Sequence, residues 1–184
     1  MGYRVILLAI GAIVLTGCGT HAAKSPSPSP KRSSTSSQTI VEGDAQYAGT
    51  TNLKKWEQQA NTHPNSWTDQ VQAGRAAYSN DKPSFAIKYY QQAIKANPKQ
   101  GLAYNNLGNV YDHLLHNYSM AAKYYQKATI IAPSYDYGWF NYSYAETQLG
   151  NKAKSKQIAN KALTVLPKTD PLYKYIQLLS QGKL

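Results

Sequence analysis

The chain has 184 residues and a formal net charge of +11, from 20 Lys and Arg against 9 Asp and Glu. This length accommodates one folded domain with a linker, and the single cysteine excludes a disulfide within the chain. The positive charge favours an anionic partner. Only 16% of the residues are charged, and 16 tyrosines take many of the positions that charged residues usually occupy.

The first 17 residues are predicted to be a signal peptide. Residues 1–4 form a short basic leader, and residues 5–14 are apolar but too few for a bilayer span, which takes roughly 20 residues. Leu15-Thr16-Gly17-Cys18 then resembles the bacterial lipobox, in which a diacylglycerol is attached to the cysteine before cleavage just ahead of it. The alternative is an ordinary secretory signal with an incidental cysteine.

The lipobox resemblance implies a mature chain that starts at Cys18 and is lipid-anchored on the extracytoplasmic side of a bacterial membrane, the cell membrane or an outer membrane. The diacylglycerol, often joined by an N-acyl chain, gives stable anchoring, and no other cofactor is expected. A protein in that place rarely meets nucleic acid, so anionic lipid or wall polymer is the expected electrostatic partner.

Residues 18–49 are predicted to be a disordered tether. Residues 25–30 alternate Ser with Pro, and residues 31–37 continue with polar side chains. Such a composition cannot bury a core and favours an extended spacer between the membrane and a folded domain.

Helical patterning begins near Asn52 and continues to the end of the chain. Helices are expected near residues 52–60, 66–79, 83–96, 101–114, 118–131, 135–148, 152–165 and 171–181. Pro64, Pro98, Pro133 and Pro167 each follow a helical stretch and stand 34, 35 and 34 residues apart. No segment alternates long enough to predict a strand, so the fold class is all-α, and the fixed period indicates a repeat protein.

Small residues recur at fixed places in the period, where they let two paired helices approach closely. Each unit is counted from the third residue after a proline. Its eighth position holds Gly74, Gly108 and Ser143, and its twentieth holds Ala86, Ala121 (after one inserted residue) and Ser155. The second unit, Tyr104-x-x-Leu107-Gly108-x-x-Tyr111 followed by Ala121, Tyr125, Ala128 and Pro133, is similar to the tetratricopeptide repeat. The third unit departs from the pattern at Ser143, Glu146 and Ser155, and the first at Gln70 and Ala77.

This resemblance implies a right-handed α-solenoid over residues 50–184. Three helix hairpins are expected at about 67–100, 101–135 and 136–169, with a preceding helix and a C-terminal capping helix at about 170–182. One additional residue between Tyr111 and Ala121 predicts a lengthened loop or a local bulge.

The resemblance also implies that the first helix of each repeat lines a concave groove for a protein or peptide partner. The candidate groove residues are Thr68, Gln72, Arg75, Tyr78, Asn105, Asn106, Asn109, Asp112, Tyr137, Asn141 and Tyr144. Asparagine amides both donate to and accept from a peptide bond, and tyrosine rings order at little entropic cost. The alternative is that several of these side chains only solvate the helix or pack, which is the expectation for Leu102 and Phe140.

Catalytic chemistry is not predicted. His113 and His116 lie close to Asp112, but no further ligand cluster accompanies them, so no metal site is expected. The sequence has no Gly-rich phosphate loop and no Gly-x-Ser-x-Gly elbow.

The sequence therefore predicts a non-enzymatic scaffold that binds a partner segment in its groove and assists assembly of an envelope, pilus or secretion complex. The alternative is a cell-envelope structural protein that adheres to anionic lipid or wall polymer through lysines on the second helix of each repeat: Lys88, Lys95, Lys123, Lys127, Lys152, Lys154, Lys156 and Lys161. End-to-end self-association is a third hypothesis, and the sequence leaves the oligomeric state open.

Overall fold

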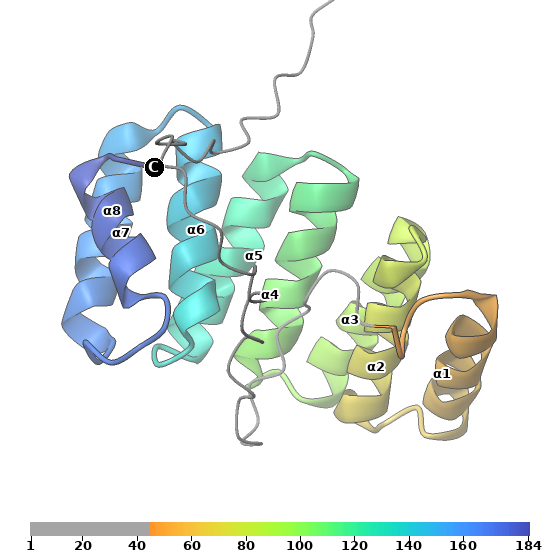
Figure 1. Ribbon diagram of the computed structural model, residues 1–184. Helices are drawn as coiled ribbons and strands as arrows, with labels where there is room; N and C mark the ends of the chain where they lie inside the picture. Colours follow the sequence, from red (N-terminus) through yellow and green to blue (C-terminus); the bar gives the residue numbers. More distant parts are fainter. Residues whose placement is uncertain (1–44) are drawn as a thin grey trace, which may run out of the picture. The chain divides into compact units, whose positions relative to one another are not determined.

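The computed structural model describes residues 45–184 (Figure 1). The predicted signal peptide, Cys18 and most of the predicted tether lie outside the described residues. The helices are α1 (Thr50–Thr62), α2 (Trp67–Ser79), α3 (Pro83–Ala96), α4 (Gly101–Asn109), the π-helix η1 (Val110–Leu114), α5 (Tyr118–Ile131), α6 (Asp136–Gln148), α7 (Lys152–Val165) and α8 (Tyr173–Gln181). Residues 45–184 contain no strand, which confirms the all-α class.

Consecutive helices pack against one another in chain order, as Figure 1 shows. α2 pairs with α3, α4 with α5 and α6 with α7, while α1 packs on α2, and α8 covers α7 and α6. These three hairpins, with a helix before and a helix after them, form the predicted α-solenoid. Within the described part of the chain, no helix has the length and apolar character needed to cross a membrane.

Local sequence signals set the helix boundaries. The Ser66 side chain accepts from the backbone N–H of Asp69 at 3.3 Å, and the Asn117 side chain accepts from that of Met120 at 3.0 Å. These are N-cap contacts that satisfy otherwise unpaired N–H groups at a helix start. Pro83 begins α3, where its fixed φ suits the first helical residue.

The paired helices of the first two repeats meet at a glycine and a tyrosine ring. A Cβ placed on Gly74 would lie 2.5 Å from Cε1 of Tyr90, and one placed on Gly108 would lie 2.5 Å from Cε1 of Tyr125. Both tyrosines are fully buried. No side chain larger than hydrogen fits at these positions, so the predicted role of the small residues is confirmed.

In the third repeat, hydrogen bonds between the paired helices replace the contact of glycine with tyrosine. Ala159 takes the place of the buried tyrosine, and Ser143 takes the place of the glycine. The Ser143 hydroxyl lies 2.9 Å from both the Oγ and the carbonyl oxygen of Ser155. Thr147 Oγ1 adds a contact of 2.8 Å to the same Ser155 hydroxyl. The two serines that depart from the repeat pattern are therefore partners in one contact.

Glu146 departs from the pattern for a related reason. Its carboxylate is 2% exposed, lies 2.6 Å from Nζ of Lys154 on α7, and accepts from Nδ2 of Asn151 at 2.8 Å. The hydrogen bond to Glu146 raises the pKa of Lys154 above its ordinary value. This charged contact ties the end of α6 to the beginning of α7.

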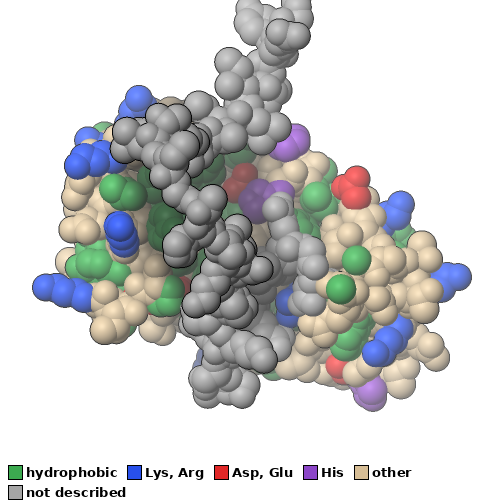
Figure 2. Space-filling view, viewed as in Figure 1, with side chains coloured by type: hydrophobic (Ala, Val, Ile, Leu, Met, Phe, Trp, Pro, Cys, Tyr) green, Lys and Arg blue, Asp and Glu red, His purple; other side chains and the backbone are tan. Residues whose placement is uncertain are grey.

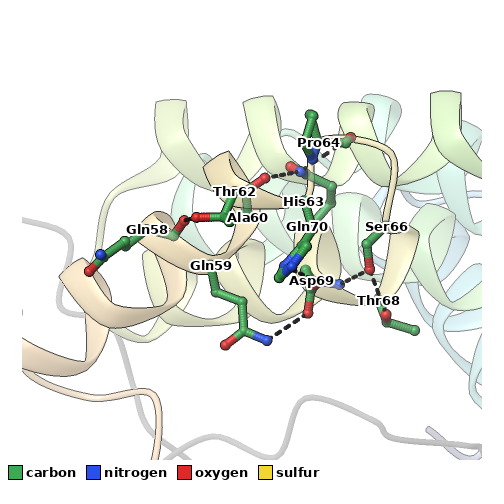
Figure 3. Close-up of polar contacts among 10 residues, drawn as sticks. All are labelled: Gln58, Gln59, Ala60, Thr62, His63, Pro64, Ser66, Thr68, Asp69 and Gln70. Carbon is green, nitrogen blue, oxygen red and sulfur yellow. Dashed lines mark hydrogen bonds and ion pairs between the residues drawn. The ribbon is translucent and has the colours of Figure 1, made fainter.

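Gln70 makes the contact that an aromatic residue makes in the third repeat. Its Nε2 donates to the carbonyl oxygens of Ala60 at 2.8 Å and Pro64 at 3.4 Å, across the turn between α1 and α2 (Figure 3). At the same place in the third repeat, Nε1 of Trp139 donates to the carbonyl of Pro133 at 2.7 Å. Each side chain thereby fixes the preceding turn.

The additional residue of the second repeat forms a π-helix. α4 continues into η1 without a break, and the N–H of Leu115 donates to the carbonyl of Val110 at 3.2 Å. Single π-turns commonly absorb one inserted residue within an α-helix. Of the two predicted outcomes, the structure has the local bulge. It carries Asp112 and His113.

Two clusters of buried side chains form the core. Tyr90 and Leu107 belong to the first, and Tyr125, Trp139 and Ile176 belong to the second. Half-buried hydrophobic side chains pack against one or both clusters: Tyr111 against both, Leu102 and Leu114 against the first, and Phe140 against the second. The packing expected for Leu102 and Phe140 is thus confirmed.

Candidate functional site

The candidate groove residues lie on the first helix of each repeat: α2, α4 with η1, and α6. We call the side of these helices that carries them the helix A face. Thr68 lies on it at the beginning of α2, where its exposed hydroxyl is 3.0 Å from Oγ of Ser66 in the turn shown in Figure 3. The other candidates fall into three groups along the solenoid.

The first group consists of Gln72 and Arg75 on α2, and both contact the side chain of Tyr47. Its ring is 2% exposed, its hydroxyl donates to Oε1 of Gln72 at 2.5 Å, and the guanidinium carbon of Arg75 lies 4.2 Å from the ring centroid. Trp56 of α1 packs on the same ring at 5.7 Å between centroids. A guanidinium over a phenol ring is an attractive cation–π pair.

The sequence assigns Tyr47 to the tether, yet the structure packs it into the domain. The available signal is that Tyr47 is the only aromatic residue between residues 18 and 49. The folded part of the chain therefore begins before the predicted boundary at residue 50.

The second group surrounds the π-helix and is joined by hydrogen bonds. The hydroxyl of Tyr78 lies 2.6 Å from Nδ1 of His113, connecting α2 to η1. The hydroxyl of Tyr125 on α5 forms hydrogen bonds with Oδ1 of Asn109 at 2.8 Å and Oδ2 of Asp112 at 3.1 Å. Asn109 and Asp112 thus use part of their hydrogen-bonding capacity within the fold.

Burial dominates the electrostatics of this group. It raises the pKa of the Asp112 carboxyl, against the opposing effects of His113, of the Tyr125 hydrogen bond and of His116. Burial also raises the pKa of Tyr125 well above its ordinary value, so this hydroxyl remains a donor. Within residues 45–184, no three His, Cys, Asp or Glu side chains gather as they would around a metal ion.

The third group is a row of asparagine amides. Nδ2 of Asn141 on α6 donates to Oδ1 of Asn105 at 3.0 Å and to Oδ1 of Asn109 at 3.3 Å, both on α4. Asn105 and Asn106 are fully buried. Within the described residues, Nδ2 of Asn105 and both polar atoms of Asn106 make no hydrogen bond. A buried polar atom without a partner costs about 1–3 kcal/mol. Asn141, which is only half-buried, is the member of the row that a ligand can reach.

Aromatic rings of α6 and α8, two of them exposed, accompany this amide row. Phe140 and Tyr144 stack with centroids 6.1 Å apart, and Tyr175 of α8 meets Phe140 edge-on at 6.4 Å. Tyr144 is 40% exposed and Tyr175 is 52% exposed. Tyr137 is half-buried against Tyr135. The sequence missed Tyr175 because it belongs to the capping helix, outside the repeat pattern.

The lysines lie on other helices. All eight lysines that the sequence places on the second helices are exposed on α3, α5 and α7. In Figure 2, Lys and Arg side chains project mostly at the two ends of the view, and a small group of acidic and histidine side chains lies nearer the middle.

The comparisons with known proteins identify the repeat. Residues 89–123 and 137–169 each match a family model described as tetratricopeptide repeat. The human protein "Tetratricopeptide repeat protein 6" is 42% identical over 64 residues, which are 35% of this chain and 12% of that protein. The chain therefore corresponds to only about an eighth of the length of this curated relative.

Solved structures agree on the fold. The TPR2B domain of yeast Sti1, in a complex with pHsp70, has a TM-score of 0.56 and 16% identity, over 64% of this chain and 94% of that chain. MamA has a TM-score of 0.59 and 17% identity, over 72% of this chain and 77% of that chain. The chain therefore carries tetratricopeptide repeats, folded as an α-solenoid like those of these proteins.

Proposed function

We propose that this chain is a protein-interaction scaffold that binds an extended segment of a partner along the helix A face. Tetratricopeptide domains bind protein or peptide partners, and proteins built from such repeats are generally non-enzymatic scaffolds. The single observation that carries the proposal is the half-buried amide of Asn141, positioned by hydrogen bonds to Asn105 and Asn109, on the same helix as the exposed ring of Tyr144.

The chemistry of this row favours an uncharged main chain over a charged terminus. The amides supply both donors and acceptors, as a peptide bond requires. Family members that clamp a C-terminal carboxylate use Lys and Arg at set groove positions. This chain has no Lys or Arg there, and the residues at those positions are Val71, Leu102, Asn105, Asn106, Tyr137 and Asn141. We therefore infer that the ligand is an internal segment whose side chains pack on Phe140 and Tyr144.

We further propose that the scaffold works outside the cytoplasm, anchored by a diacylglycerol on Cys18, and aids assembly of an envelope, pilus or secretion complex. The lipobox resemblance of residues 15–18 supports this proposal. Cells fed labelled palmitate test it. The full chain should take up label and fractionate with membranes, whereas Cys18→Ser should remain unlabelled and soluble. Labelling of both would contradict the anchor.

A second candidate function is adhesion to anionic lipid or wall polymer through the eight lysines on the second helices of the repeats. The observation that favours it is the exposure of all eight of them on α3, α5 and α7. Salt separates the two functions, because exposed charges are screened beyond about 8 Å at physiological ionic strength. Contacts through amides and aromatic rings are far less sensitive.

Affinity capture with three baits tests the primary proposal. The first is the full chain, the second carries Asn105→Ala, Asn141→Ala and Tyr144→Ala, and the third carries Lys95→Gln, Lys123→Gln and Lys152→Gln. A specific protein retained by the first and third baits at high salt, and lost by the second, is the expected result. Retention that all three share, or that only the lysine variant loses, would contradict groove binding.

A further inference from the structure

The segment before α1 is bound to the domain as a ligand would be. Of residues 45–49, only Tyr47 is buried, and the other four are exposed. Three side chains donate to main-chain carbonyls of the segment. Two belong to α1, with Nε1 of Trp56 bound to Gln46 at 3.1 Å and Nδ2 of Asn52 bound to Ala48 at 2.8 Å, and the third is Nδ2 of Asn80, just after α2, bound to Tyr47 at 2.8 Å.

The site that receives Tyr47 is built from groove positions. Gln72 accepts from the hydroxyl, and the guanidinium of Arg75, itself 3% exposed, lies over the ring. The hydrogen bond selects tyrosine over phenylalanine, and the guanidinium selects a ring over an aliphatic side chain. These contacts define a subsite for a tyrosine at the first repeat.

The link between Tyr47 and α1 is suited to movement. Gly49 has a φ of 87°, a conformation that L side chains rarely adopt, and a Cβ there would meet nothing within 4 Å. Within residues 45–49, the buried side chain of the segment is therefore Tyr47, and the glycine that follows it can redirect the chain.

We propose that the Tyr47 subsite is a tyrosine-binding part of the partner groove, and that Tyr47 is its displaceable intramolecular occupant. This inference rests on the proposed function and names one feature of the partner, a tyrosine in the bound segment. A partner already held on the amide row presents its tyrosine at high local concentration and competes with Tyr47. The closed state lowers the partner's apparent affinity by the fraction of molecules that are open.

Chemical modification of Arg75 in the full chain tests this. The probe for the empty subsite is phenylglyoxal, with modification at Arg75 quantified by mass spectrometry against an added reference peptide. Arg75 should react slowly in the wild type and at least about tenfold faster in Tyr47→Ala, as expected if the wild-type segment is open a tenth of the time or less. Tyr47→Phe keeps the ring but loses the hydrogen bond to Gln72, and should react at a rate between those of the wild type and Tyr47→Ala.

The ligand probe is a synthetic peptide with the sequence of residues 44–53. At millimolar concentration it should restore the protection of Arg75 in Tyr47→Ala, and the same peptide with alanine in place of its tyrosine should not. Equal Arg75 reactivity in the wild type and Tyr47→Ala would overturn the proposal. So would a Tyr47→Ala protein that loses its circular dichroism signal, or a peptide that fails to protect, because Tyr47 would then be a fixed part of the fold.

This test uses no natural partner, so its outcome is separate from that of the capture experiment. Protection by the peptide together with failed groove capture would refute the scaffold function while leaving the tyrosine subsite in place. Groove capture without peptide protection would refute only the subsite.

Discussion

The contact between Gly108 and Tyr125 links the repeat register to stability, and Gly108→Ala tests it. The added Cβ would lie 2.5, 2.6 and 3.1 Å from Cε1, Cδ1 and Cζ of the Tyr125 ring. That ring is fully buried, and its hydroxyl is held by Asn109 and Asp112. The ring has to move, and movement loosens these hydrogen bonds.

The expected cost follows from these distances. Overpacking of a well-filled core costs about 1–3 kcal/mol, and the rigid ring places this site near the upper limit. Weakening of the Tyr125 hydrogen bond adds about 1 kcal/mol, while the better helix propensity of alanine returns about the same amount. We expect a net loss of about 2–3 kcal/mol, which lowers Tm by about 6–10 °C for a domain of this size.

Thermal unfolding followed by far-ultraviolet circular dichroism measures this change. Gly138→Ala is the matched control, because a Cβ there would lie 3.4 Å from Tyr135 Cδ1 and 3.5 Å from Ala128 Cβ, which are ordinary contacts. The control should melt at or slightly above the wild-type temperature, since alanine favours the helix by about 1 kcal/mol. A Gly108→Ala protein that melts as high as the control would refute the packing of Tyr125 on α4.

Three further changes test the polar contacts of the fold. Because the folded-state pKa of Asp112 is raised, its stabilising contribution is complete below the unfolded pKa of about 4 and is lost as pH rises through the folded value. Asp112→Asn should therefore raise Tm at neutral pH but not at pH ~4, and an equal shift at both pH values would contradict this. Lys154→Ala leaves the buried Glu146 carboxylate without its cationic partner and should lower the free energy of unfolding in denaturant by about 1–3 kcal/mol. Adding Glu146→Gln should recover most of this loss. Ser155→Ala removes the hydroxyl shared with Ser143 and should cost about 1–2 kcal/mol, whereas an unchanged denaturation midpoint would show that the serine contact is dispensable.

Much of the helical pattern was predictable because its signals are local. The bounds of α3, α5 and α7 agree with the sequence prediction at both ends, since prolines and asparagines mark where those helices begin and the preceding turns end. The close contacts at Gly74 and Gly108 were predictable too, because a small residue that recurs at one position of a helical repeat usually marks a close approach of two helices.

Other features depend on tertiary contacts that a single sequence does not display. Counting residues does not distinguish a longer loop from a bulge in the helix, because either one accommodates a single additional residue. The π-helix allows both Tyr111 and Leu114 to pack on the first core cluster. The pairing of Asn141 with Asn105 depends on the distance between successive helices, and the burial of Tyr47 depends on how α1 packs on α2. Sequence patterns identified the helix A face, and the structure shows which side chains contact one another on it.

Site-specific photo-crosslinking in living cells tests the central claim most directly. A photoreactive phenylalanine analogue placed at Tyr144, on the helix A face, is compared with one placed at Ile130, which is 71% exposed on α5. We expect that a discrete partner crosslinks at position 144 and not at position 130, and that Asn105→Ala with Asn141→Ala abolishes the product. Crosslinking at position 130 alone would contradict binding on the helix A face and assign the working surface to the second helices.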